Sequence, residues 1–254
     1  MFASYFGVFD GHGGSKVAAY AANNLHRFIV KREEYKENRE EAIKEGFLEC
    51  DRTMKTVDSL KDEMAGCTAI TAMVRGKVIL CPDWSSVAIL TCDWSAQELW
   101  CANAGDSRCV AGLGGVARPL STDHKPMDTL ERERIEAAGG FVEFNRVNGN
   151  LALSRALGDF VFKMNDQLPQ VEKTDMVQVP FLFSHIFLIF QSDQIVTCLP
   201  DVVHDIIDPE WDFMILACDG IWDVLSSQEV VDFITERISR GMEPEDICED
   251  LMNR

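Results

Sequence analysis

Apolar residues recur at helical spacing in five stretches of the chain. The first two are residues 15–30 and 39–60, and each presents an apolar stripe between charged positions. Three more helices are predicted over residues 128–140, 226–241 and 243–254. In the first helix the stripe consists of Val17, Tyr20, Leu25 and Phe28.

Apolar and β-branched runs predict strands between these helices. Residues 5–9, 65–74 and 212–218 are such runs, and residues 98–113 predict two short strands joined by a turn at Gly105 and Asp106. Strands come in groups and helices in pairs, without regular alternation. This order favours a mixed α+β layered domain over a doubly wound sheet.

Two of the strands end in the same local pattern. FGVFDGHGG and MILACDGIWD each place Asp-Gly directly after an apolar run, so Asp10 and Asp219 each follow a strand. If those strands are neighbours, the two carboxylates converge. Asp106 adds a third carboxylate on a turn, and Asp223 lies one turn beyond Asp219. A single Asp-Gly is most often a plain turn, and the argument therefore depends on the repetition.

Grouped carboxylates repel one another unless cations neutralise them. Oxygen ligands without a histidine or cysteine cluster favour Mg²⁺ or Mn²⁺. Two such ions about 3.5–4 Å apart can clamp a phosphoryl group. His12 follows Asp10 by two residues, and beside such a site it could donate a proton to a leaving alkoxide. The alternative for His12 is a structural role near a turn.

Charge limits the class of partner. The 254 residues carry a formal net charge of -18, which argues against binding nucleic acid through its phosphates. Basic protein partners, carboxylates grouped around cations, and ordinary acidic solubility are all compatible with this charge.

The nine cysteines are scattered and show no CxxC spacing. We therefore expect neither a zinc site nor a redox pair, and we expect an intracellular protein, cytoplasmic and/or nuclear. The N-terminal residues have no basic region typical of a signal peptide.

Two stretches fit this organisation poorly. Residues 76–97 separate two strands that would pair more naturally through a short hairpin. Residues 176–192 are strongly apolar but are interrupted by Pro180 and His185, so no membrane span is predicted. For 176–192 a buried strand pair, a membrane-contacting element and inserted sequence all stay open.

Seven motifs occur in one order along most of the chain, and together they resemble the metal-dependent serine/threonine protein phosphatases of type two-C, the PPM family. The match is closest to the animal gamma-like branch. The resemblance implies a sandwich of two antiparallel β-sheets flanked by helix pairs, with a metal site at one end. The motifs are FGVFDGHGG, AGCTA, ANAGDSR, DHKP, RIEAAGGFV, RVNGNLALSRALGDF and ACDGIWDVLSSQEVVDF.

The resemblance also implies the members of a binuclear Mg²⁺ or Mn²⁺ site. By match to the family motifs, Asp10 would bridge two metal ions, the Gly11 carbonyl would hold one of them and Asp219 would hold the other. A metal-bound hydroxide would then attack the phosphorus of phosphoserine or phosphothreonine in a protein substrate.

Further positions are carried over in the same way. Asp106 and Asp223 match residues that, with Asp219, bind a weaker third metal ion. His12 matches the proposed general acid. A flap that shapes substrate access would lie near residues 158–175.

The chain also departs from the family pattern. The resemblance implies one phosphatase domain over residues 1–254, truncated at both ends and lengthened by insertions near 76–97 and 176–192. The sheets are therefore expected to be incomplete at both chain ends, and these residues alone are expected to fall short of normal activity. The predicted function is that of a monomeric hydrolase acting on phosphoproteins. The alternative is a catalytically impaired, phosphatase-derived scaffold or phosphoprotein-binding module.

Overall fold

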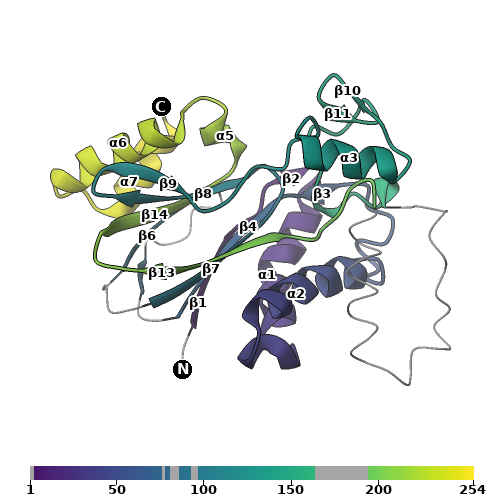
Figure 1. Cartoon of the computed structure of the whole chain (residues 1–254), viewed down its shortest axis with the longest axis horizontal. Helices are drawn as coiled ribbons and strands as arrows, with labels where there is room; N and C mark the ends of the chain where they lie inside the picture. The colour runs from purple at the N-terminus through teal and green to yellow at the C-terminus, as the bar shows by residue number, and fades with distance from the viewer. Residues whose placement is uncertain (1–2, 76–77, 81–85, 93–96, 164–193) are drawn as a thin grey trace. The chain divides into compact units, whose positions relative to one another are not determined.

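The computed structural model describes residues 3–75, 78–80, 86–92, 97–163 and 194–254. The chain divides into two compact units (Figure 1). The first unit comprises Met1–Asp10, Thr68–Asp123 and Asp201–Arg254, and the second comprises Gly11–Cys67 and His124–Pro200. Each unit therefore combines segments that are distant in the sequence.

The first unit contains two antiparallel sheets. A four-stranded sheet has the order β1-β4-β7-β13, and a five-stranded sheet has the order β5-β6-β14-β8-β9. The strands of the four-stranded sheet are β1 (Ala3–Val8), β4 (Ala69–Arg75), β7 (Gln97–Ala104) and β13 (Asp201–Ile207). Those of the five-stranded sheet are β5 (Val78–Leu80), β6 (Val87–Cys92), β14 (Trp211–Ala217), β8 (Arg108–Leu113) and β9 (Val116–Pro119).

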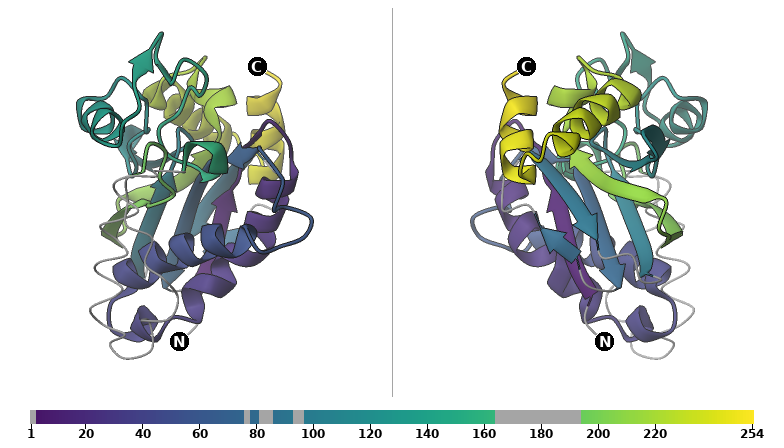
Figure 2. Two further views of the ribbon diagram at one scale, coloured as in Figure 1. Left: turned by 90° about the vertical axis from the view of Figure 1, so that its right-hand side faces the viewer. Right: turned by 90° about the vertical axis from the view of Figure 1, so that its left-hand side faces the viewer.

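The two sheets share one apolar core. Ile70 and Leu99 from the four-stranded sheet pack in one cluster with Leu90, Met214 and other residues of the five-stranded sheet. Alternate residues of β6 and β14 point the opposite way, because side chains alternate along a strand. These residues form a second core with the three C-terminal helices, of which α6 and α7 lie side by side (Figure 2). The helices are α5 (Asp219–Trp222), α6 (Ser227–Ser239) and α7 (Pro244–Met252).

The second unit is mainly helical. α1 (Lys16–Val30) and α2 (Arg39–Met54) form a close pair. A three-stranded sheet has the order β12-β3-β2. Its strands have two residues each: β2 (Gly11–His12), β3 (Gly66–Cys67) and β12 (Leu157–Gly158). The other elements are η1 (Glu33–Lys36), α3 (Thr129–Ala137), the hairpin of β10 (Val142–Glu143) and β11 (Arg146–Val147), and η2 (Phe160–Phe162).

The predicted α+β class with antiparallel sheets is confirmed. One detail is wrong: β1 and β14, the strands before Asp10 and Asp219, are not neighbours in one sheet but belong to the two different sheets. The turn at Gly105 and Asp106 joins two strands as predicted, and it carries the chain from one sheet to the other. Strand pairing is decided by distant partners, so local sequence did not reveal it.

The two flanking strands of the 76–97 stretch, β4 and β7, pair directly, from Ala69 with Ala104 to Arg75 with Glu98. Within the stretch, β6 pairs with β14 and contributes Ile89 and Leu90, both fully buried. Whether 76–97 is an insertion relative to the family stays a prediction. Residues 176–192 lie outside the described part of the chain.

The four-stranded sheet has β1 and β13 at its edges, and the five-stranded sheet has β5 and β9, among the strands that the structure describes. That these sheets lack further strands of the family fold stays a prediction.

Candidate metal centre

Asp10 is placed by the end of β1 and by one backbone contact. The strand ends at Val8, and the Asp10 carbonyl accepts a hydrogen bond of 2.9 Å from the Thr68 amide. The Thr68 hydroxyl lies 2.6 Å from the hydroxyl of Ser107, in the turn that contains Asp106. Thr68 therefore links the backbone of Asp10 to this turn. Sequence reasoning did not single out Thr68 or Ser107.

Asp219 is placed by the sharp turn between β14 and α5. The strand ends at Ala217, and Asp219 is the first residue of the short helix. The Trp222 indole donates a 2.8 Å hydrogen bond to the Ala217 carbonyl, and the Asp223 amide donates to the Asp219 carbonyl at 2.8 Å. These bonds fix the turn, so the Asp219 carboxylate projects from a defined position.

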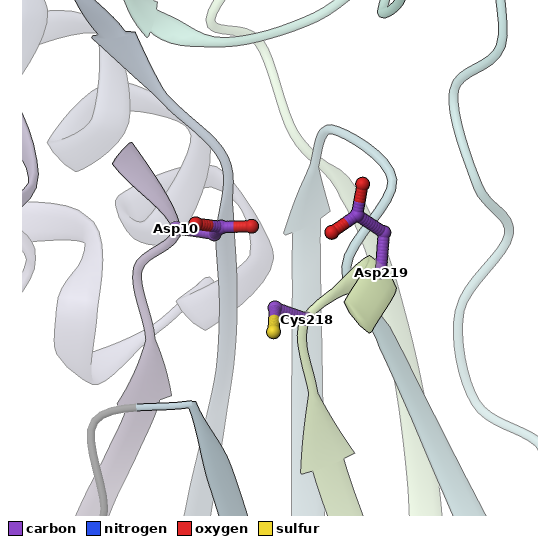
Figure 3. Close-up of side chains that lie close together, drawn as sticks. All are labelled: Asp10, Cys218 and Asp219. Carbon is purple, nitrogen blue, oxygen red and sulfur yellow. The ribbon is translucent and has the colours of Figure 1, made fainter. Parts of the chain in front are cut away.

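The structure brings Asp10 and Asp219 together, as their shared pattern predicts. One ligand atom from each of Asp10, Cys218 and Asp219 lies within 4.8 Å of the others, and all three residues are partly buried. Figure 3 shows the two carboxylates directed toward each other, one from each sheet of the first unit. Two carboxylates this close repel each other without a cation, and their oxygens are the ligands that hard divalent ions prefer. The donor set therefore fits Mg²⁺ or Mn²⁺.

Cys218 is a member of this group that sequence reasoning missed. Its only sequence signal is its position directly before Asp219. Burial raises the pKa of the Cys218 thiol, and the charges of Asp10 and Asp219 raise it further. Because hard cations prefer oxygen to sulfur, the two carboxylates are the atoms of this group that suit Mg²⁺ or Mn²⁺.

Asp106 and Asp223 do not join this group of three within the part of the chain that the structure describes. Asp106 is buried in the turn between β7 and β8, where the Asn103 side chain donates 3.0 Å to the Gly105 carbonyl. Asp223 follows the last residue of α5. Their assignment to a third metal ion stays a prediction.

His12 and Gly11 form β2 in the second unit. His12 Nε2 lies 2.6 Å from Oδ2 of Asp159, a buried residue that sequence reasoning did not select. The pair spans 147 positions of the chain, so no local pattern could have revealed it. The roles of Gly11 as a carbonyl ligand and of His12 as an acid stay predictions.

Comparison with known proteins decides the family. The family model described as protein phosphatase 2C matches residues 2–254. The chain belongs to the protein phosphatase 2C family. Among curated protein phosphatases 2C, a probable member from Caenorhabditis elegans is 45% identical over 99% of this chain and 59% of its own length. Protein phosphatase 2C homolog 2 of Schizosaccharomyces pombe is 44% identical over 99% of this chain and 57% of its own length. This chain thus spans less than two thirds of the length of these relatives.

Solved structures support the same fold. A phosphatase from Toxoplasma gondii aligns with a TM-score of 0.76 and 24% identity, over 99% of this chain and 79% of the other. At this level of identity the match shows that the two chains share a fold, and it shows nothing about their functions. Membership of the animal gamma-like branch within the family stays a prediction.

No helix among the described residues is long and apolar enough to cross a membrane.

Proposed function

We propose that this member of the protein phosphatase 2C family is a metal-dependent protein serine/threonine phosphatase. The observation that carries the proposal is the approach of Asp10 and Asp219 at the ends of two facing sheets. Family membership supports the same reaction class.

Asp10 and Asp219 would hold Mg²⁺ or Mn²⁺ through their carboxylates. Such ions, when bound, supply Lewis-acid catalysis and activate water for attack on a phosphate ester. Asp10 would bridge two ions, with the Gly11 carbonyl on one and Asp219 on the other. Asp106 and Asp223 would complete a weaker third site with Asp219. The turn hydrogen bonds of Asp10 and Asp219 hold these carboxylates in place before the ions bind.

His12 would deliver the proton that the leaving oxygen of serine or threonine needs. It follows Asp10 by two residues, so the backbones of the two residues are close neighbours along the chain. An alkoxide is a poor leaving group, and a positioned acid typically contributes on the order of 10²–10⁴ in rate.

We infer that the substrates are phosphoproteins and that the chain acts as a monomeric, single phosphatase domain in the cytoplasm and/or nucleus. The seven cysteines whose side chains the structure describes are all free, which supports a reducing compartment.

The test is phosphate release from a phosphothreonine peptide with Mn²⁺, with Mn²⁺ removed by a chelator, and with Asp219→Asn. We expect turnover that needs Mn²⁺ and that Asp219→Asn abolishes, while Asp58→Asn, on the exposed surface, leaves it intact. Peptide binding without any turnover would instead favour the alternative function, a catalytically impaired scaffold or phosphoprotein-binding module.

A further inference from the structure

The small three-stranded sheet of the second unit brings His12 and Asp159 together. β3 lies between β2, which contains His12, and β12, which is followed directly by Asp159. A Cβ atom on Gly66 would collide with the Asp159 carboxylate and would lie 2.6 Å from His12 Nε2. The side-chain pair therefore lies directly over the Gly66 backbone, where no larger residue fits.

The carboxylate of Asp159 is fixed by its backbone. Asp159 adopts a left-handed conformation with φ 49° and ψ 40°, which L-residues rarely occupy. Its amide donates 3.1 Å to the Ala65 carbonyl, and its carbonyl accepts 3.0 Å from the Phe162 amide. The Asp159 side chain is only 4% exposed, whereas that of His12 is 31% exposed. Only the histidine end of the pair thus reaches solvent.

A buried lysine supports the negative charge of Asp159. Lys163 donates 2.7 Å to Asp51 and lies in the same buried region, with side chains 2% and 3% exposed. Burial lowers the pKa of Lys163, but the charge and hydrogen bond of Asp51, with smaller contributions from Cys198 and Asp159, outweigh burial and raise the pKa overall. Asp159, Lys163 and Asp51 therefore form a series of alternating charge inside the second unit, and His12 contacts its Asp159 end.

We propose that Asp159 is the positioning residue for His12: its carboxylate accepts the hydrogen on Nε2 and fixes the ring in one tautomer and one orientation. This inference rests on the proposed phosphatase function. In the protonated ring Nε2–H stays bound to Asp159, so Nδ1 would give its proton to the leaving oxygen as the phosphorus–oxygen bond breaks, and the neutral Nε2–H tautomer would remain. The electron pair of that bond stays on the oxygen and takes the proton.

The experiment compares two substrates that differ in their need for an acid. The leaving group of a phosphothreonine peptide requires a proton, whereas the leaving group of p-nitrophenyl phosphate departs as a stable anion. For Asp159→Ala we expect kcat on the peptide to fall about 30- to 100-fold and kcat on the aryl ester to fall less than about 3-fold. KM for both substrates and the affinity for Mn²⁺ should stay within about 2-fold of wild type.

Asp159→Asn is the control for a loss of activity that arises only because Asp159→Ala misfolds. Asparagine also tolerates the left-handed conformation, and its side-chain oxygen can still accept from Nε2. We expect this variant to recover most of the peptide activity. Asp58→Ala, at an aspartate whose side chain is 98% exposed, is the matched control and should behave as wild type.

A second readout is independent of catalysis. Nitrogen-15 spectra recorded where the imidazole is neutral should show His12 as the Nε2–H tautomer in wild type and in Asp159→Asn, and as a mixture in Asp159→Ala. An Nδ1–H tautomer in wild type, or an equal loss of kcat on both substrates, would overturn the inference. A wild-type chain that released no phosphate from any peptide would refute the proposed function instead, and the tautomer would then decide the role of Asp159 alone.

Discussion

Lys163 and Asp51 form an ion pair inside the second unit, with Nζ and Oδ1 2.7 Å apart and both side chains almost fully buried. Lys163 also donates 2.8 Å to the Ala156 carbonyl, and Asp51 also accepts 2.8 Å from the Gly158 amide. The pair therefore ties α2 to the segment around β12 that presents Asp159. Each charge is satisfied only while the other is present.

Removing one partner should destabilise the fold strongly. We expect Lys163→Met to lower the free energy of unfolding by about 3–5 kcal/mol, because it leaves Asp51 charged and buried without a cation. The measurement is urea unfolding followed by circular dichroism. Lys61→Met, which breaks an exposed pair with Asp58, should cost less than about 1 kcal/mol. Similar losses in the two variants would contradict the prediction.

Glu131 should make stability depend on pH. Its carboxylate accepts hydrogen bonds from Arg134, Arg155 and Ser154. Burial raises the pKa of Glu131, but these partners outweigh it and lower the pKa from 4.5 to about 2. The folded-state pKa lies below the unfolded one, so the stabilisation is complete above pH 4.5 and is lost as the pH falls toward 2.

The test is the unfolding free energy of Glu131→Gln against wild type at several pH values. The difference should be largest near neutral pH and should shrink by about 2 kcal/mol between pH 6 and pH 3. Glu133→Gln, an exposed position on the same helix, is the control and should follow the wild-type curve. A difference that did not change with pH would refute the assignment.

The sequence predicts the convergence of Asp10 and Asp219 because both follow a strand within a few residues, which is local information. It does not predict that their strands lie in different sheets, because pairing joins β1 to β4 and β14 to β6 and β8, which are distant in the chain. Asp159 was missed for the same reason. Its motif is local, but its partner His12 is 147 residues away.

Whether β6, residues 87–92, belongs to the apolar core of the first unit can be tested by mutation. Ile89 on β6 is fully buried in the cluster beneath the C-terminal helices. We expect Ile89→Ala to lower the free energy of unfolding by about 2–4 kcal/mol, because a buried isoleucine leaves a cavity. Val116→Ala, at a valine that is 63% exposed on β9, should cost less than about 0.5 kcal/mol. A neutral Ile89→Ala would mean that β6 adds little to the core.

The effect of Asp219→Asn on stability should have opposite signs in the absence and in the presence of Mn²⁺. Without metal, Asp10 and Asp219 repel each other across less than 4.8 Å, so Asp219→Asn should raise the melting temperature by about 1–3 °C. With Mn²⁺ at 100 times its dissociation constant, wild type should gain about 2.7 kcal/mol of stability. Asp219→Asn should lose most of this gain, because the amide removes one of the two charged ligands.

Calorimetric titration with Mn²⁺ and thermal unfolding with and without the ion measure both effects. Asp58→Asn controls for the loss of one negative charge from a strongly acidic chain, since its side chain is 98% exposed and outside the group. It should leave both the affinity and the Mn²⁺-dependent shift unchanged. Equal Mn²⁺ affinity in Asp219→Asn and Asp58→Asn would show that overall charge, and not the paired carboxylates, attracts the ion. A lower melting temperature of metal-free Asp219→Asn would show that the carboxylate stabilises the turn more than it repels Asp10.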